Sequence, residues 1–232
     1  MRIESRDAVA AFQERVRGAY PLFEQGSLQM FQLQVGAGNP AVTPVSSSVW
    51  RFLTADRQLS VALTSDSITL QAHTYEGREA FIGRWGTLLE HLEAVFTPSL
   101  VLRTGARYVN RLTGESLHRL ADLVQPNLVG VALPDLRVHV TQAVSEANMT
   151  VEEGQLMLRW GVLPVGVTFD SSLLPPAAGD SWVLDIDIFN ETQKPFSGNA
   201  LAEEFRTLGE RAYSVFRWVI TEAGMTHFGA RS

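Results

Sequence analysis

Hydrophobic and polar positions in the first fifty residues predict one helix, one strand and one loop. Apolar residues recur at helical spacing in 5–19, and Ser5 stands where an N-cap is needed. Apolar residues then alternate with glutamine in 28–35, a pattern typical of a half-exposed strand. The glycine, proline and serine content of 36–48 predicts a loop.

The next fifty residues predict an antiparallel meander that leads into a helix. Three β-rich runs at 49–53, 59–63 and 67–75 are separated by short polar links of hairpin length. Apolar residues at steps of three and four then predict a helix from about 77 to 96.

The second half of the chain shows a similar alternation. It predicts, in order, a helix over 115–124, strands over 136–146 and 155–163, a long loop over 164–179, a strand over 182–189 and a closing helix over about 199–222. Runs of hairpin strands with helices at their ends are typical of an α+β fold with antiparallel sheets. We therefore expect one α+β domain over 1–232. A similarity between DSITLQAHTY and DSWVLDIDIF also raises the hypothesis of a pseudo-repeat, about 28–98 and 135–223.

Two predicted strands carry charge on one side only. Because side chains alternate across a strand, Arg103, Arg107 and Arg111 in LVLRTGARYVNRL share one face, opposite an apolar one. In WVLDIDIF, Asp185 and Asp187 likewise share a face opposite leucine and isoleucine.

Three interpretations of these strands are open. If the strands are neighbours, arginine–carboxylate pairs form a structural ladder between them, which we favour. Alternatively, Arg103, Arg107 and Arg111 bind a phosphorylated or carboxylated ligand. The third interpretation is a metal at Asp185 and Asp187, for which carboxylate ligation would suit magnesium, manganese or calcium.

Composition narrows the function classes. The chain has no cysteine, which excludes disulfides, thiolate zinc sites and a cysteine nucleophile, and fits a reducing cytoplasm. A net charge of −6 argues against nucleic-acid binding, and no apolar run is long enough to cross a membrane. The sequence lacks G-x-S-x-G, H-E-x-x-H and phosphate-loop motifs, so it indicates no catalytic residue and no cofactor.

Several segments in order resemble a known family. They are YPLFEQ (20–25), VWRF (49–52), TYEGREAF (74–81), RTGARYVNRL (103–112), LDIDIF (184–189) and HFG (227–229). Together they resemble a sporadically distributed prokaryotic family of hypothetical proteins marked by an R-Y-x-N-R-[IL] strand. Members usually open with a P-[IV]-x-E-A strand, which this sequence lacks, so one sheet edge is expected to differ. The family has no established activity, and its patchy distribution suggests mobile or defence-associated genes.

The expected function is that of a non-enzymatic binding or regulatory module in the cytoplasm. It would act through protein–protein contacts, with a protein partner or with a second copy of itself. One alternative is an enzyme or sensor of a phosphorylated ligand that uses the three arginines, with Asp185 and Asp187 as metal ligands. Another is a component of a toxin–antitoxin or antiphage system.

Overall fold

The computed structural model describes residues 5–34, 41–132, 136 and 138–229, and for 28–34 and 41–46 it describes the backbone alone. Its helices and antiparallel sheets make the chain an α+β protein, which confirms the predicted fold class. The chain divides into two compact units. The N-terminal unit comprises 1–101 and 195–202, and the C-terminal unit comprises 102–194 and 203–232. The single α+β domain expected over 1–232 stays a prediction.

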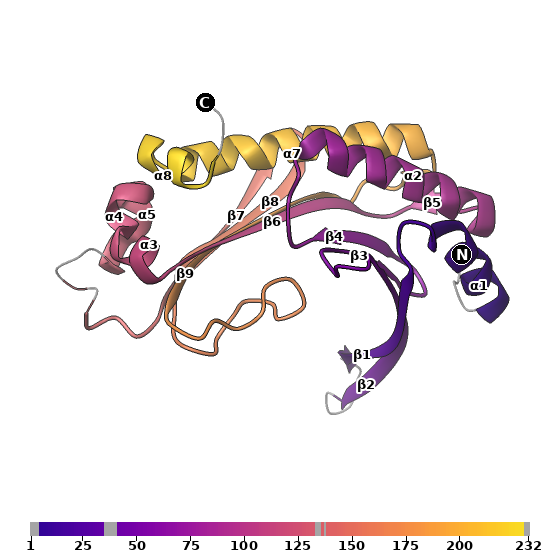
Figure 1. Ribbon diagram of the computed structural model, residues 1–232, viewed down its shortest axis with the longest axis horizontal. Helices are drawn as coiled ribbons and strands as arrows, with labels where there is room; N and C mark the ends of the chain where they lie inside the picture. Colours follow the sequence, from indigo (N-terminus) through magenta and orange to yellow (C-terminus); the bar gives the residue numbers. More distant parts are fainter. Residues whose placement is uncertain (1–4, 35–40, 133–135, 137, 230–232) are drawn as a thin grey trace. The chain divides into compact units, whose positions relative to one another are not determined.

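The N-terminal unit is a four-stranded sheet with two helices on one face (Figure 1). Its elements are α1 (Arg6–Val16), β1 (Leu22–Gln34), β2 (Ala41–Leu53), β3 (Leu59–Leu63), β4 (Ile68–Ala72), α2 (Arg78–Phe96) and β5 (Leu100–Val101), which pairs with β10 (Lys194–Pro195). The strands are antiparallel in the order β1-β2-β3-β4. Phe12 of α1, Phe52 of β2 and Leu88 of α2 lie at the centre of the core. As predicted, the Ser5 side chain caps α1 by accepting from the Ala8 amide.

The predicted loop over 36–48 is wrong from residue 41 onward, where β2 begins; 35–40 lie outside the described residues. β2 pairs with β1 along its whole length, from Ala41 opposite Gln34 to Leu53 opposite Leu22. Only its last four residues also pair with β3. Pro44 therefore lies where β2 has a neighbour on one side only, a position at which a strand tolerates a missing N–H. The partner strand overrides the local loop signal.

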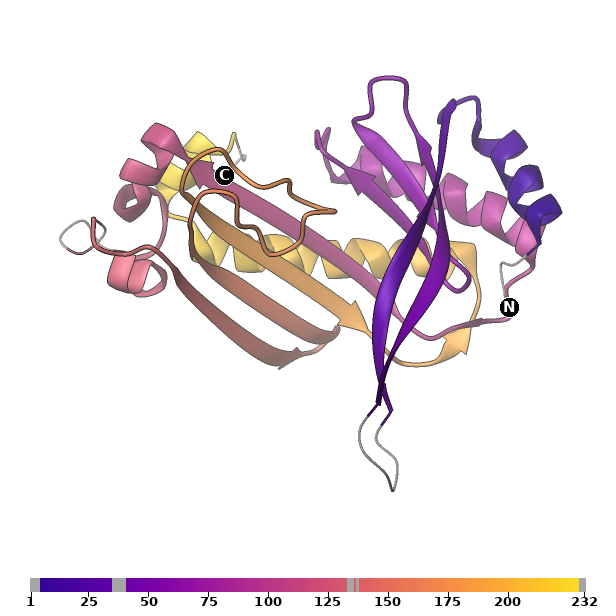
Figure 2. The same cartoon turned by 90° about the horizontal axis from the view of Figure 1, so that it is seen from below.

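The C-terminal unit is a second four-stranded antiparallel sheet, in the order β6-β9-β8-β7. Its elements are β6 (Thr104–Thr113), α3 (Gly114–His118), α4 (Leu120–Leu123), α5 (Pro126–Val129), the short 3₁₀ helix η1 (Gly130–Ala132), β7 (Ala143–Val151), β8 (Gly154–Leu163), β9 (Ser181–Asn190), α8 (Glu222–His227) and residues 203–219 of α7 (Gly198–Val219). The apolar sheet face, with Leu158, Leu184 and Ile186, carries α7 (Figure 1). The opposite face carries the segment 164–180, which contains no helix or strand, in agreement with the predicted loop (Figures 1 and 2).

The predicted strand over 136–146 is wrong in its position, since β7 covers Ala143–Val151. β7 is an edge strand whose one neighbour in the sheet is β8. Ala143 pairs with Val162, and β8 ends at Leu163, so the alternating residues before 143 have no strand to pair with. The helix predicted over 115–124 is likewise divided between α3 and α4.

The strand orders of the two sheets can be compared with the predicted pseudo-repeat. Three consecutive antiparallel strands and a long helix occur in both units, as β2-β3-β4 with α2 and as β7-β8-β9 with α7. The fourth strand differs, because β1 joins at β2 whereas β6 joins at β9. A duplication over 28–98 and 135–223 stays a prediction, and it would explain at most the shared three strands and helix.

Candidate functional site

The charged face of the C-terminal sheet is built by β6, β9 and β8. β6 and β9 are antiparallel neighbours, with Arg107 opposite Asp187 and Arg111 opposite Val183. All the odd-numbered residues of these two strands therefore share a face. β8 adds Arg159, which lies opposite Asp185. Together with Arg103, which directly precedes β6, this face brings four arginines and two aspartates together, beside the apolar side chains of Val183 and Phe189.

Asp185 is the centre of this charged cluster. Its carboxylate is 0% exposed and accepts three hydrogen bonds of 2.8 Å. Arg107 donates two of them, from Nε and Nη2, and Arg159 donates the third from Nη2. A buried carboxylate needs this degree of pairing to offset its lost hydration. The hydrogen bonds to Asp185 raise the pKa of Arg107 above the ordinary arginine range.

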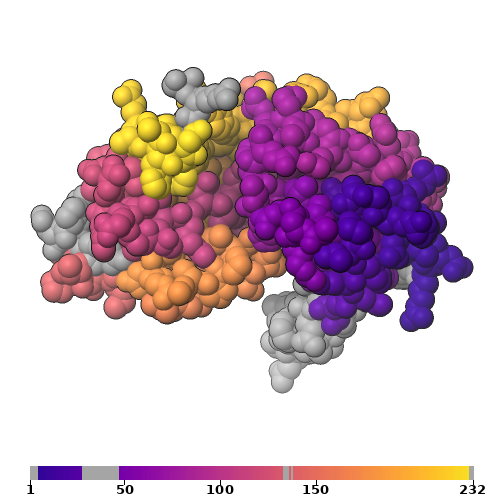
Figure 3. Space-filling view, viewed as in Figure 1, coloured from indigo at the N-terminus to yellow at the C-terminus, as the bar shows by residue number. Residues whose placement is uncertain are grey.

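The segment 164–180 covers this cluster. Asp170 Oδ2 accepts from Arg107 Nη1 at 3.1 Å, and Asp170 Oδ1 accepts from the backbone and hydroxyl of Ser172. Burial acts to raise the pKa of Asp170, but the Ser172 hydrogen bonds and the Arg107 charge outweigh it, so this pKa is lowered. The ring of Phe169 lies 4.3 Å from the Arg159 guanidinium carbon. In the space-filling view the segment forms a continuous part of the visible surface (Figure 3).

At the rim of the cluster, Arg103 and Asp187 form a weaker pair. Arg103 Nη2 donates to Asp187 Oδ2 at 3.3 Å, and the Arg103 side chain is 47% exposed. The guanidinium also lies over Phe189 at 4.3 Å. Burial raises the pKa of Asp187, against the opposing charges of Arg103 and Arg107. Such a pair stabilises a fold far less than the buried contacts of Asp185.

These contacts confirm that the two charged strands are neighbours. The three predicted arginines differ, however, in whether they have a carboxylate partner. Arg103 and Arg107 are ion-paired with Asp187 and Asp185, whereas Arg111 has no carboxylate partner among the described residues. Both oxygens of Asp185 are taken up by guanidinium groups, a geometry that favours the ladder over a metal at the aspartates. Within the described part of the chain, no three histidine or acidic side chains cluster as metal ligands would.

Arg159 and Asp170 belong to the cluster but were not selected from the sequence. Arg159 had a usable signal, because it alternates with Leu158 and Trp160 in a predicted strand and so lies on the face opposite those apolar side chains. Asp170 had none, since the conformation of a long loop does not follow from residue periodicity.

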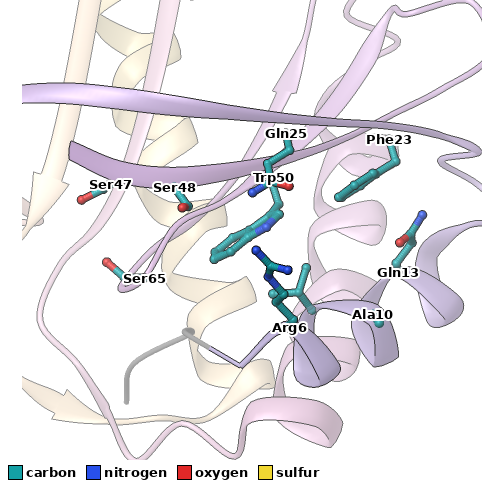
Figure 4. A pocket seen from close by; sticks show the side chains of 10 residues that line it. Arg6, Ala10, Gln13, Phe23, Gln25, Ser47, Ser48, Trp50 and Ser65 are labelled. Carbon is teal, nitrogen blue, oxygen red and sulfur yellow. The ribbon is translucent and has the colours of Figure 1, made fainter.

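The N-terminal unit contains an open groove of about 570 Å³ between α1 and the strands β1 and β2 (Figure 4). Phe23, Gln25 and Trp50 project into it from the strands, facing Arg6 and Gln13 of α1. The other lining residues are Val9, Ala10, Ser47, Ser48 and Ser65. Trp50 is buried in the core of this unit and also borders the groove. The sequence analysis missed the groove, because nothing in a strand pattern shows where a helix stops covering a sheet.

The groove exists because the core face of the sheet continues beyond α1. Phe23 lies opposite Phe52 in the β1–β2 ladder, and their rings are 5.5 Å apart, so both belong to this face. Phe52 is fully buried, whereas Phe23 is 41% exposed. The edge strand β1 thus presents part of a core face without a covering element among the described residues.

Comparison of the chain with family models, curated proteins and solved structures found no match. Among the described residues, no helix has both the length and the apolar character required to cross a membrane.

Proposed function

We propose that the protein is a non-enzymatic binding module that holds an extended segment of a partner protein in the groove of its N-terminal unit. The observation that carries this proposal is the 41% exposed Phe23 on a sheet face whose neighbouring residue, Phe52, is fully buried. An apolar face left open beside polar lining groups is typical of an interaction surface. The cytoplasmic location inferred from the lack of cysteine belongs to the same proposal.

The form of the groove favours an extended peptide. β1 is the terminal strand of its sheet, so its outer edge has no strand partner among the described residues. A peptide added along that edge would direct alternate side chains to the core face, beside α1. The hydrogen bonds of the added strand would supply affinity, and Phe23 and Trp50 would select an apolar side chain.

The charge of the groove favours an acidic partner. Arg6 is the one charged side chain among the ten lining residues, and it has no ion pair within the described structure. Its position on the first turn of α1, facing the strands, is accessible to a carboxylate of the bound segment. The predicted partner segment therefore combines an apolar side chain with an acidic one at a fixed spacing.

A random peptide library selected on the immobilised full-length protein tests this proposal. Enriched peptides are expected to share the apolar–acidic spacing. By fluorescence anisotropy, Arg6→Glu and Phe23→Ala should each weaken their binding at least tenfold, about 1.4 kcal/mol. Trp218→Ala is the matched control, since Trp218 is an aromatic residue of the other unit with 57% exposure. Enrichment without a shared pattern, or binding that survives both groove substitutions, would contradict the proposal.

The other two functional hypotheses differ in their support. A phosphorylated-ligand enzyme that uses all three arginines and both aspartates is disfavoured by the ion pairs that already join Arg103 and Arg107 to those aspartates. Membership of a toxin–antitoxin or antiphage system stays a hypothesis that rests on the resemblance.

A further inference from the structure

Arg111 differs from every other arginine of the charged face. It lies on β6 four residues after Arg107, on the same face. Its one hydrogen bond in the structure is a long one, 3.5 Å from Nη2 to the Thr168 hydroxyl. Its Nε is buried and has no acceptor within the described part of the chain. Arg103, Arg107 and Arg159 each contact an aspartate.

The missing partner of Arg111 is a counter-ion. Burial lowers the pKa of Arg111, and no carboxylate of the described residues is seen to act in the other direction. A guanidinium nevertheless stays protonated in proteins, so Arg111 cannot relieve the cost of burial by losing its charge. The Arg111 side chain is half-buried, and the buried part of a cation is stabilised by an anion or by full hydrogen bonding; among the described residues Arg111 has neither. Arg159 also leaves its Nε without an acceptor, but Asp185 balances its charge.

The neighbouring arginine shows what would satisfy this group. Arg107 holds the two oxygens of Asp185 with the paired donors Nε and Nη2, each at 2.8 Å. In Arg111 the same pair of donors consists of the unpartnered Nε and the Nη2 that makes only the long Thr168 contact. This fork matches the spacing of two oxygens in a carboxylate or phosphate group.

We propose that Arg111 forms a binding site for a small oxyanion, a phosphate or carboxylate group, under the segment 164–180. The anion would accept from Nε and Nη2 of Arg111. Thr168 would form one wall of the site, held in place by its own hydrogen bond from the hydroxyl to Leu174 O at 2.9 Å. The site lies in the C-terminal unit, and it is independent of the groove and of the peptide proposed to occupy it.

Thermal unfolding of the full-length protein with added anions tests the site. Sodium phosphate and sodium acetate are compared with sodium chloride at equal ionic strength, for wild type, Arg111→Gln and Arg103→Gln. At least one of the two oxyanions should raise the wild-type midpoint saturably above that in chloride, because a ligand specific to the native state stabilises it. Arg103→Gln, which removes an exposed ion-paired arginine directly before the same strand, should keep that shift. Arg111→Gln should bind at least tenfold more weakly.

Arg111→Gln is expected to fold, because the substitution removes a cation that has no carboxylate partner among the described residues. A second readout is the Nε–H signal of Arg111 in nitrogen-15 NMR, which should move on titration with the effective anion. Saturable binding of phosphate, acetate or both that depends on Arg111 supports the proposal, and the comparison identifies the chemical class. No saturable shift with either anion, or an undiminished shift in Arg111→Gln, would overturn it.

Discussion

Replacing Asp185 by asparagine tests whether the charged cluster is a structural element. The substitution keeps the shape of the side chain and removes the charge that two guanidinium groups share. The asparagine amide would also set an N–H donor against an arginine donor. Breaking a fully buried ion pair by removing one partner costs about 3–5 kcal/mol. Since Asp185 is 0% exposed, we expect Asp185→Asn to lower the free energy of unfolding by about that amount.

The matched control is Asp187→Asn, two residues along the same face. Asp187 pairs with Arg103, which is about half exposed, at 3.3 Å, and burial raises the pKa of Asp187, so its ionised form gains little from the fold. This substitution should cost about 0–1 kcal/mol. Urea unfolding measures both values, followed by circular dichroism and by the fluorescence of Trp160 and Trp182 in the C-terminal unit.

The comparison separates a ladder from a ligand site. A loss of under about 1 kcal/mol for Asp185→Asn, or equal losses for the two variants, would refute the reasoning that burial makes Asp185 the centre of the cluster. A stable Asp185→Asn variant would instead mean that water or a mobile cover already compensates the two guanidinium groups.

Two further predictions concern acid stability and backbone geometry. Glu153 accepts two hydrogen bonds from Arg211, which lower the pKa of Glu153 below the ordinary range of a glutamate. A depressed carboxyl pKa stabilises the fold above the unfolded-state value and loses that effect as pH falls through the folded-state value. Glu153→Gln should therefore be less stable than wild type at neutral pH. Urea unfolding at a series of pH values should show that this difference in stability vanishes well below pH 4.5. A difference that stays constant with pH would contradict this prediction. Gly161 has φ +150°, and an added Cβ would lie 1.9 Å from the Ala143 carbonyl oxygen. Gly161→Ala should therefore lower the free energy of unfolding, measured in urea, by about 3 kcal/mol or more. Gly83, in α2 with open space around it, is the control, and Gly83→Ala should stabilise by about 0.5–1 kcal/mol; a similar effect at both glycines would contradict the steric argument.

The charged strands show which features of the site can be predicted from residue periodicity. Alternation placed Arg103, Arg107 and Arg111 on one face and matched them with the oppositely charged face of LDIDIF, and the two strands are indeed neighbours. It did not determine that Arg107 holds Asp185 while Arg103 holds Asp187, since that choice depends on the register of the ladder. A shift of two residues would have kept every face and exchanged the partners.

The first and last residues of the strands likewise depend partly on the local sequence and partly on neighbouring strands. β3 matches its prediction over 59–63, because two neighbouring strands and a clear pattern agree there. β2 begins inside a predicted loop, and β7 begins seven residues after the predicted start. In both cases the limit is set by the strand that lies alongside, a partner distant from the local pattern.

The sequence by itself determined the α+β class, the faces of the strands and the opposite charges of two of them, because these follow from residue spacing within a segment. Only the tertiary structure decided which arginines are neutralised and where a core face is left open. Arg159 and Asp170 reach the cluster from another strand and from a loop, and within the described part of the chain Arg111 has no carboxylate partner. Phe23 is exposed because α1 ends its cover of the sheet before β1. Both outcomes depend on contacts between distant segments, and residue spacing within a segment does not predict which segments come into contact.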